Sequence, residues 1–440
     1  MQTILAVNCG SSSIKFKLFT LPNLDTLIYG QASNVASKGS KPSIKLTVHH
    51  GTTGAQDDHA SEEEEENMPY EDVFERIVAL VEEKATTLKQ FEQFKADDVI
   101  KAVSHRVVHG GTETEPMLIS QEHQEGLQKL DDLSDFAPLH NHRAVQVVKF
   151  CLKHLPKTYQ ILCFDTLFHS TLPAHIYTYP ITAPKKEPAI PLRKYGAHGL
   201  SYAYILRTMS EHLKKNPEHL NLIMCHLGSG ASVCVVKNGK SFDTSMGLTP
   251  LEGLPGGTRT GSIDPALIFH HTPDASEKVE FNGLPVSKGE MIMNKEGGLQ
   301  AIAGTSNFGA IASTMSSSKP DTKAPQLTPE IAKLAYDIFL DRLLNFVGAY
   351  LLKLKGNIDA IVFSGGIGER SIDLRRDLAT YIDGCEIDEE INSKGVNTGN
   401  GDVVEISQKG GKGPRMFVCF TDEETQTAMM TLEVLEQKNL

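Results

Sequence analysis

The same short pattern occurs twice in this chain, about half its length apart. The first copy covers residues 4–19, "ILAVNCGSSSIKFKLF", and the second covers 222–236, "LIMCHLGSGASVCVV". Each has a buried apolar run, a turn of glycine and serine, and a second apolar run. In the first copy Ile14, Phe16 and Leu18 alternate with lysines, which is the two-residue period of a half-buried strand. Each copy therefore predicts a β-hairpin, and the repetition indicates a duplicated fold.

The tip of the first hairpin is richer in polar groups than a simple turn requires. It offers Asn8, three serines and Lys15, so backbone N–H groups, hydroxyls and an ammonium lie close together in the chain. These groups suit an anion, and phosphate above all. The P-loop spacing G-x-x-x-x-G-K-[ST] is absent, and a plain hairpin remains the alternative interpretation.

Strands and helices alternate along the rest of the chain. Apolar runs predict strands in "SIKLTVHH" (43–50), "IKAVSHRVVHGG" (100–111) and "TYQILCFD", which ends at Asp165. A third turn, "SGGIGER" (364–370), follows an apolar run and leads into a helical stretch. None of these turns has the G-x-G-x-x-G spacing of a Rossmann fold. The alternation, with polar residues gathered at strand ends, predicts an α/β fold.

The sequence predicts two helices near the C-terminus, one from its start and stop residues and one from its apolar face. Thr328 and Pro329 are typical of a helix start, and Gly356 is typical of a stop. Because the segment is apolar nearly all round after Leu343, we expect it to be buried between domains or at a subunit interface. Residues 422–440 predict a final helix with one apolar face.

Composition limits the class of protein. At 440 residues the chain has room for two or three domains. Its net charge of −12 argues against general nucleic-acid binding, which needs surplus lysine and arginine. Residues 51–67, "GTTGAQDDHASEEEEEN", predict an acidic, solvated loop.

Cysteine usage and apolar run length indicate the compartment. The seven cysteines are scattered and form no C-x-x-C pair, which is typical of a reduced, intracellular protein. The N-terminus lacks a basic leader, and no apolar run approaches the ~18 residues of a membrane span. We therefore expect a cytoplasmic protein with no membrane partner.

A series of motifs, in order along the chain, resembles the acetate kinase family. They are "VNCGSSSIKF", "HRVVHGG", "APLHN", "FDTLFH", "RKYGAHG", "HLGSGAS", "TSMGLTPLEGLPGGTRTGSIDP", "FSGGIGE" and "FTDEE". The resemblance implies the superfamily of sugar kinases, actin and heat-shock ATPases, with duplicated ribonuclease-H-like domains closing over a nucleotide in an interdomain cleft. It implies an ATPase-like domain I over 1–167, with the C-terminal helix 422–440 packing back on it. The nucleotide-binding domain II then covers 168–421, and the chain forms a homodimer.

The resemblance also implies a reaction. It is the reversible, direct in-line transfer of the γ-phosphoryl group of ATP to acetate, giving acetyl phosphate and ADP, with Mg²⁺ as the metal and Mn²⁺ as an alternative. Such a transfer needs positive charge and alignment around two anions. Arg106 and Arg259 match the family's catalytic arginines, and neither lies on an apolar stripe, so we expect their loss to leave folding little affected. Asp165 matches a catalytic aspartate, for which we favour orientation over proton transfer because acetate is already ionised. His198 matches the histidine that stabilises the transition state.

The remaining site residues are likewise implied by the resemblance. His140 is a plausible partner behind the site. Asn8 and Glu423 match the metal ligands, as oxygen donors that suit Mg²⁺. The acyl site would be formed by Arg106, Val108, Leu139, Ala197 and Pro250. The nucleotide site would be formed by Ser11, Ser13, Lys15, His226, Leu227, Gly228, Ser229, Gly230, Asn307, Phe308, Gly366, Ile367, Gly368 and Glu369.

Some positions depart from the family pattern. Ser229 replaces an asparagine, Asn307 and Gly309 stand where an aspartate and an arginine are usual, Asp422 replaces a common asparagine and Tyr202 a usual histidine. Ala197 replaces a phenylalanine near the acyl methyl group, which opens the pocket to propionate unless Phe168 or Tyr202 fills the space. The alternatives are therefore a propionate or butyrate kinase, or a pyrophosphate-dependent acetate kinase. A filament or chaperone ATPase of the same superfamily would not need a carboxylate clamp.

Overall fold

The computed structural model describes residues 2–10, 12–35, 39, 41–49, 58–88, 96–136, 141–188, 190–281, 284–317, 326–393 and 403–440. The chain divides into two compact units. Unit 1 comprises Met1–Leu167, Glu187–Pro191 and Asp422–Leu440, and unit 2 comprises Phe168–Lys186 and Leu192–Thr421. Among the helices described, none is both long enough and apolar enough to cross a bilayer.

Unit 1 is built on a mixed sheet with the strand order β5-β4-β3-β2-β1-β6-β8-β7. The predicted first hairpin is confirmed, because β1 pairs antiparallel with β2. On its other side β1 pairs parallel with β6, and β6 pairs parallel with β8. The strands are β1 (Thr3–Cys9), β2 (Ser13–Thr20), β3 (Thr26–Ser33), β4 (Ser43–Val48), β5 (Asp58–Glu63), β6 (Ile100–Val107), β7 (Met117–Ile119) and β8 (Tyr159–Phe164).

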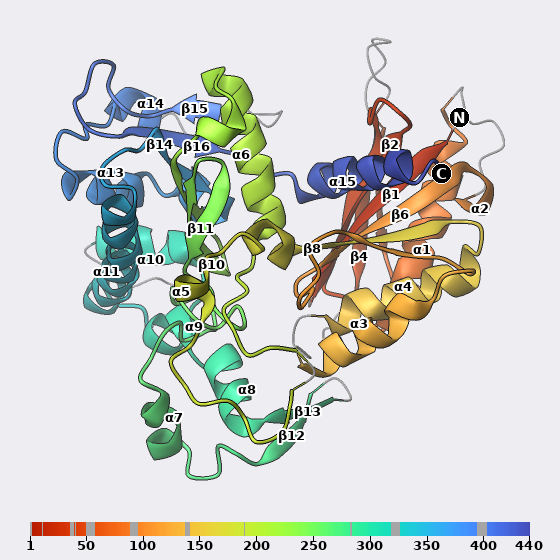
Figure 1. The fold of residues 1–440 in the computed structure, drawn as a ribbon, viewed down its shortest axis with the longest axis horizontal. Helices are drawn as coiled ribbons and strands as arrows, with labels where there is room; N and C mark the ends of the chain where they lie inside the picture. The colour runs from red at the N-terminus through yellow and green to blue at the C-terminus, as the bar shows by residue number, and fades with distance from the viewer. Residues whose placement is uncertain are drawn as a thin grey trace. The chain divides into compact units, whose positions relative to one another are not determined.

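Helices cover both faces of this sheet (Figure 1). Strand side chains point alternately to the two faces. On one face, Val103 of β6 packs in a core with α1 and α4. On the other face, the Cys163 thiol of β8 donates a 3.8 Å hydrogen bond to the Thr427 carbonyl of α15. The C-terminal helix therefore packs across β1, β2, β6 and β8, opposite α1 and α4. The helices of unit 1 are α1 (Tyr70–Ala85), α2 (Ala96–Val99), α3 (Glu125–Phe136), α4 (His142–His154) and α15 (Glu423–Gln437).

The acidic segment is not a loop throughout. Of the predicted loop 51–67, residues 51–57 lie outside the described part of the chain, but Asp58–Glu63 forms strand β5 on the edge of the sheet. The prediction is wrong there because the backbone pairs with β4, Ala60 packs against the core, and Arg76 of α1 donates a 2.6 Å hydrogen bond to Glu62. These contacts outweigh the tendency of the glutamates to stay in water.

Unit 2 repeats the arrangement. Its sheet has the order β11-β10-β9-β14-β16-β15, in which β9 pairs antiparallel with β10 and parallel with β14, and β14 pairs parallel with β16. This is the same succession as β2, β1, β6 and β8, so the predicted duplication is confirmed. The strands are β9 (Leu222–Leu227), β10 (Ala231–Lys237), β11 (Lys240–Thr244), β14 (Ala360–Ser364), β15 (Val403–Glu405) and β16 (Arg415–Cys419), with β12 (Lys278–Phe281) and β13 (Leu284–Ser287) as a separate hairpin.

The sheet of unit 2 lies between α6 and α11, since alternate strand residues join two separate apolar cores. The helices are α5 (Ala174–Tyr177), α6 (Gly199–Leu213), α7 (Pro265–His271), α8 (Lys288–Lys295), α9 (Gly298–Ala303), α10 (Phe308–Met315), α11 (Pro329–Lys353), α12 (Gly365–Arg370), α13 (Ile372–Thr380) and α14 (Glu389–Ser393).

Helix α11 begins as predicted, with the Thr328 hydroxyl accepting a hydrogen bond from the Ile331 N–H. Its apolar surface is divided. Leu343 and Val347 pack in the core of unit 2 itself, whereas Leu352 is 81% exposed in the single chain. The expected burial between domains is therefore wrong for the packed face, and a subunit contact stays a prediction.

Candidate active site

Unit 1 brings four of the predicted residues together at the carboxyl ends of its parallel strands. Arg106 of β6 lies directly opposite Asn8 of β1, and Asp165 follows the last residue of β8. The Arg106 guanidinium donates to both carboxylate oxygens of Asp165, at 2.8 Å from Nη2 and 3.3 Å from Nε. Its Nη1 donates to Asn8 Oδ1 at 3.2 Å and lies 3.3 Å from Glu423 Oε2. Strand register thus assembles a network from four distant parts of the chain.

This network is largely withdrawn from water. Asp165 is fully buried, and the Arg106 side chain is 19% exposed. Burial alone would lower the pKa of Arg106, but the carboxylates of Asp165, Glu423 and Glu424 raise it above its usual value. The guanidinium therefore stays charged and is held as a bidentate fork, which is the geometry that recognises carboxylate and phosphoryl groups.

Asn8 and Glu423 present oxygen atoms to the same positive charge. The Asn8 amide nitrogen donates to Glu423 Oε2 at 2.7 Å and lies 3.3 Å from Glu424 Oε1. No group of three or more His, Cys, Asp or Glu side chains in the described ranges is arranged to hold a metal ion. An amide oxygen and a carboxylate are nevertheless the hard donors that Mg²⁺ prefers when it keeps water and phosphate oxygens as its other ligands. The two residues therefore fit the metal of a magnesium nucleotide.

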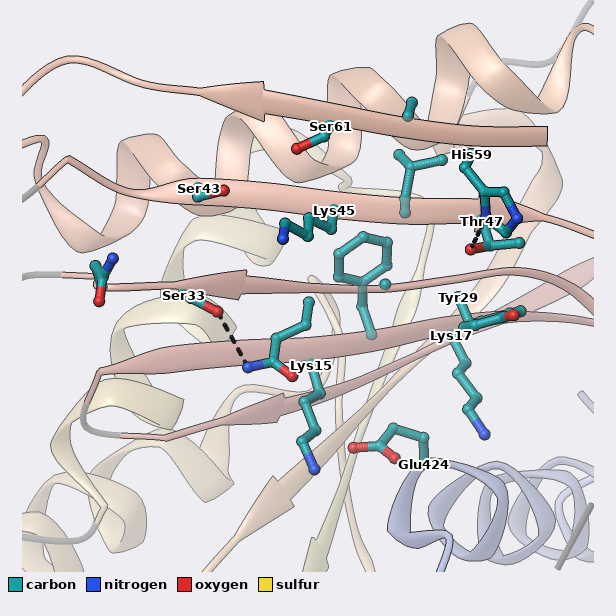
Figure 2. Close-up of a pocket in the computed structure, with 16 residues that line it drawn as sticks. Lys15, Lys17, Tyr29, Ser33, Ser43, Lys45, Thr47, His59, Ser61 and Glu424 are labelled. Atoms are coloured by element: carbon teal, nitrogen blue, oxygen red, sulfur yellow. Dashed lines mark hydrogen bonds between the residues drawn. The ribbon is translucent and has the colours of Figure 1, made fainter. Parts of the chain in front are cut away.

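Strand β2 presents two lysines beside this network. Lys15 and Lys17 line a hollow of about 990 Å³ over β2–β5, with Glu424 at its edge (Figure 2). Lys17 pairs with Asp422, the N-cap residue of α15. The Gly10 N–H donates to the Ser13 carbonyl at 2.8 Å, which closes the turn between β1 and β2. Ser11 lies outside the described residues.

In unit 2, His198 is held at the start of α6 by its side chain and its backbone. It adopts a left-handed conformation with φ of 58°, which is uncommon for a residue with a Cβ. Its Nδ1 lies 2.8 Å from the hydroxyl of Ser232, and its ring lies 4.6 Å from the ring of His226. The other ring nitrogen, Nε2, faces Gly230. If this glycine carried a Cβ atom, that atom would lie 3.5 Å from His198 Nε2.

Arg259 reaches the same glycine. A Cβ atom at Gly230 would also lie 3.5 Å from Arg259 Nη1, so the guanidinium and the His198 Nε2 meet at one point of the turn. The loop that carries Arg259 is fixed by main-chain hydrogen bonds from Gly257 to Ser229 at 2.7 Å and from Gly297 to Thr258 at 3.0 Å. Two polar groups therefore converge on the space beside the Cα atom of Gly230.

The predicted nucleotide turns lie side by side at the ends of β9 and β14. A Cβ atom added to Gly228 would lie 4.0 Å from the backbone nitrogen of Gly366. A Cβ atom added to Gly366 would have no described atom within 4 Å. His226 and Leu227 are the last residues of β9, and Ser229 and Gly230 lie in the turn that follows it. Ile367, Gly368 and Glu369 lie in α12, which follows β14.

Two further candidates lie at the start of α10. Asn307 is its N-cap residue, accepting a 3.1 Å hydrogen bond from the Ala310 N–H. The ring of Phe308 packs in the core, 5.0 Å from Phe339.

The predicted acyl residues are described only in part. Ala197 is buried and its carbonyl lies 3.0 Å from His169 Nε2, while Pro250 is buried and Val108 half-buried. Val108 directly follows β6, and the next residue is fixed by Asn141, which exchanges two hydrogen bonds with the His109 backbone at 2.7 and 3.0 Å. Leu139 and His140 lie outside the described residues.

Several residues near these groups were missed from the sequence. Glu424 contacts the network of Arg106, Ser232 contacts His198, and His169 holds the loop before His198. Glu424 stands in "FTDEE" and Ser232 in "HLGSGAS", so their positions inside motifs were a signal. Their partners could not be read locally, because each pairs with a residue at least 28 positions away.

Comparisons with known proteins show the family of this chain. A sequence model of the Acetokinase family matches residues 3–429. The chain is 46% identical to a "Probable acetate kinase" of Cryptococcus neoformans, over 98% of both chains. It is 36% identical to the acetate kinase of Desulforamulus reducens, over 98% of this chain and 100% of that one.

Solved structures give the same result. The Porphyromonas gingivalis acetate kinase matches with a TM-score of 0.76 and 30% identity, over 99% of this chain and 100% of that one. A propionate kinase from Francisella tularensis matches with a TM-score of 0.77 and 32% identity, over 98% and 99%. Sequence and structure agree over nearly the whole length, and the duplicated sheets are those of the actin-like ATPase fold. The chain therefore belongs to the acetokinase family.

Proposed function

We propose that this chain catalyses the reversible transfer of the γ-phosphoryl group of ATP to acetate, giving acetyl phosphate and ADP. The observation that supports it most directly is the convergence of Arg259 Nη1 and His198 Nε2 on the open space at Gly230. A guanidinium and an imidazole aimed at one point suit the equatorial oxygens of a transferring phosphoryl group, where charge spreads in the transition state.

The step balances without a general base. A carboxylate oxygen of acetate attacks the γ-phosphorus, the bond from that phosphorus to the bridging oxygen of ADP breaks, and no proton moves because acetate is already ionised. Arg106 binds the acetate carboxylate through N–H groups of Nη1 and Nη2 that do not donate to Asp165. Asp165 orients Arg106 and takes no proton, since both of its oxygens accept hydrogen bonds from that guanidinium. Alignment of two anions, which repel each other in water, is the main contribution of these residues.

The nucleotide binds, in this proposal, through backbone N–H groups of the turns at Gly228–Gly230 and Gly366–Gly368 and through Lys15. Mg²⁺ would be held by Asn8 and Glu423 and would neutralise charge on the phosphate oxygens. Glycines in both turns let the backbone approach the ligand closely. Partial burial lowers the pKa of Lys295, and the charge of Arg259 lowers it further, so a second cationic side chain interacts with Arg259.

The proposal extends to assembly and compartment. We infer a homodimer in the cytoplasm, supported by exposed apolar side chains of unit 2 such as Phe269, 61% exposed, and Leu352, 81% exposed. All seven cysteines lie in described ranges and are free thiols, as a reducing compartment requires. Sedimentation equilibrium of the full chain tests the assembly, and a single-chain mass at micromolar concentration would contradict it.

Steady-state assays of acyl phosphate formation test the activity. ATP, GTP and pyrophosphate are compared as donors, and acetate, propionate and butyrate as acceptors. We expect ATP with acetate to give the highest kcat/KM. The propionate kinase among the similar structures is the reason to include longer acids. A higher kcat/KM with propionate would favour the second candidate, a propionate kinase, and no acyl phosphate with any pair would contradict both.

A variant links the activity to the site. Arg259→Ala should lower kcat about 10²- to 10⁴-fold, the scale for removing a preorganised charge from a phosphoryl-transfer transition state. Arg342→Ala, at an exposed arginine of α11, is the matched control and should keep the activity. Near-normal turnover in Arg259→Ala would rule out the proposed role of Arg259.

A further inference from the structure

A chain of hydroxyl groups runs from the core of unit 2 to His198. The phenol oxygen of Tyr202 lies 2.5 Å from the Ser232 hydroxyl, and that hydroxyl lies 2.8 Å from His198 Nδ1. Tyr202 comes from the first turn of α6, four residues after His198, and Ser232 comes from β10. Tyr202 and Ser232 are both fully buried, so water does not compete for these hydrogen bonds.

The protons of this chain can be placed by the chemistry of its ends. Burial raises the pKa of Tyr202 well above its usual value, so the phenol keeps its proton. A buried phenol O–H needs an acceptor, and the Ser232 hydroxyl oxygen lies 2.5 Å from the phenol oxygen. The single phenol proton is then left for Ser232. Because a serine hydroxyl has one proton, Ser232 donates it to His198 Nδ1.

We propose that Tyr202 and Ser232 form a directed relay that keeps His198 in the tautomer with its proton on Nε2. Nε2 is the nitrogen that faces Gly230, beside Arg259. The relay thus determines that His198 presents a donor, and not a lone pair, to the space proposed for the phosphoryl group. Tyr202 and Ser232 are positioning residues, since they act through His198. This inference rests on the proposed function for its kinetic consequence, but the tautomer is a property of the protein alone.

The surroundings hold the imidazole in place for this relay. His169 contacts the Ala197 carbonyl at 3.0 Å with Nε2 and the Ser241 hydroxyl at 2.7 Å with Nδ1, so the residue before His198 is fixed to the core. The left-handed backbone of His198 then leaves its ring against His226. With backbone and ring constrained, the proton position is the remaining variable, and the relay sets it.

Substitution of the relay tests the inference. Tyr202→Phe removes the phenol oxygen and keeps the ring, and we expect kcat to fall about three- to tenfold, the scale of one neutral hydrogen bond, with KM for acetate and ATP changed less than about twofold. Ser232→Ala should lower kcat at least as much. Tyr350→Phe is the matched control, because the Tyr350 hydroxyl is buried in the same unit with no hydrogen-bond partner in the part of the chain that the structure describes. It should leave kcat unchanged.

A double variant separates positioning from packing. If Tyr202 acts only through Ser232, Tyr202→Phe should lower kcat no further in a Ser232→Ala background. Multiplied effects would indicate a purely structural role for Tyr202 and would overturn the relay.

The tautomer is measured directly by ¹⁵N NMR of ring-labelled histidine in the full chain, at a pH well above the usual histidine pKa of about 6.5. His198→Asn assigns the signal. We expect protonated Nε2 and bare Nδ1 in the wild type, and a mixed population in Ser232→Ala. A wild-type His198 protonated at Nδ1 would overturn the inference even if acetyl phosphate forms. If no acyl phosphate forms but the tautomer is as expected, the proposed function fails and the relay stands.

Discussion

A buried ion pair holds two of the charged residues of this protein. The carboxylate of Asp165 is fully buried, and its two oxygens are satisfied by one guanidinium, that of Arg106. Removing one member of a buried pair leaves the other charge without its partner and usually costs more than the pair contributes. Arg106 is therefore both a proposed substrate ligand and a structural requirement of unit 1.

Arg106→Ala tests both properties. We expect kcat to fall about 10²- to 10⁴-fold and the free energy of unfolding of unit 1 to fall by about 3–5 kcal/mol, because Asp165 loses its counter-ion. From the sequence we expect Arg106→Ala to have little effect on folding, because Arg106 lies on no apolar stripe. The structure changes this expectation, because the substitution would remove the cation that pairs with the buried Asp165. Arg106→Lys, which keeps the charge but not the fork, should recover part of the stability and little of the turnover. Wild-type stability of Arg106→Ala in urea unfolding would contradict this account.

Ala197→Phe tests the space at the proposed acyl site. Ala197 is only 2% exposed, so a phenyl ring there must displace its neighbours, at a cost of about 1–3 kcal/mol for overpacking. We expect turnover with acetate and with propionate to fall together, with their ratio changed less than about twofold. Ala197→Gly, which adds no volume, is the control for the backbone position. Retained acetate turnover with a selective loss of propionate would instead show that the pocket is open at this position.

At the scale of elements, hydrogen bonds within the chain hold the segment that follows the parallel strand β14. The Gly365 N–H donates to Glu369 Oε1 at 3.0 Å, and Gly365 has φ of 73°, where a Cβ would be strained. Arg375 of α13, itself fully buried, donates to the carbonyls of Gly368 and Glu369 at 2.7 and 2.8 Å. Both ends of α12 are thus fixed, and the backbone N–H groups of the turn are positioned in advance.

Gly366→Gln tests whether this turn accepts a nucleoside. No described atom lies within 4 Å of a Cβ at Gly366, so we expect the variant to fold with an unchanged thermal unfolding midpoint. The side chain would occupy the space proposed for the nucleoside, and kcat/KM for ATP should fall at least tenfold while that for pyrophosphate does not. Gly348→Gln on α11, where a Cβ also meets open space, is the matched control. Equal loss with both donors would place the nucleoside elsewhere.

At the scale of the whole molecule, the two units use equivalent strand positions for different chemistry. Asn8 of β1 pairs in register with Lys15 of β2, and His226 of β9 pairs in register with Ser232 of β10. One copy of the hairpin presents an amide and a cation, and the other presents an imidazole and a hydroxyl. Each unit also contains a buried histidine whose pKa is lowered: His105 in unit 1 and His169 in unit 2.

These two histidines predict the acid limit of stability. Burial lowers the pKa of His105 and of His169 from 6.5 to about 4. Between pH 6.5 and about pH 4 the unfolded chain binds more protons than the folded chain. The stability that the two neutral histidines contribute is therefore fully present above pH 6.5 and is lost as the pH falls towards 4. At about 1.4 kcal/mol per pKa unit, each contributes on the order of 3 kcal/mol.

Thermal unfolding midpoints between pH 7.5 and 4.5 measure this loss. His105→Gln should make the unfolding midpoint fall less steeply with decreasing pH. His105 Nδ1 has no hydrogen-bond partner within the described ranges, so its protonation would place an uncompensated charge in the core, and glutamine does not become protonated. His219→Gln, at an exposed histidine, should leave the slope unchanged. The same slope in all three proteins would contradict the assignment.

Local patterns were enough to predict the two hairpins, the start of α11 at Thr328 and the position of Asp165 at a strand end, because periodicity and capping depend on neighbours in sequence. Motif resemblance supplied the roles of Arg106 and His198. The strand at Asp58–Glu63, the exposure of Leu352, and the partners Glu424, Ser232 and His169 came only from the folded chain. Edge pairing and buried hydrogen bonds join residues that are far apart, as Asn8 and Glu423 are by 415 positions, and no local pattern records which of them will meet.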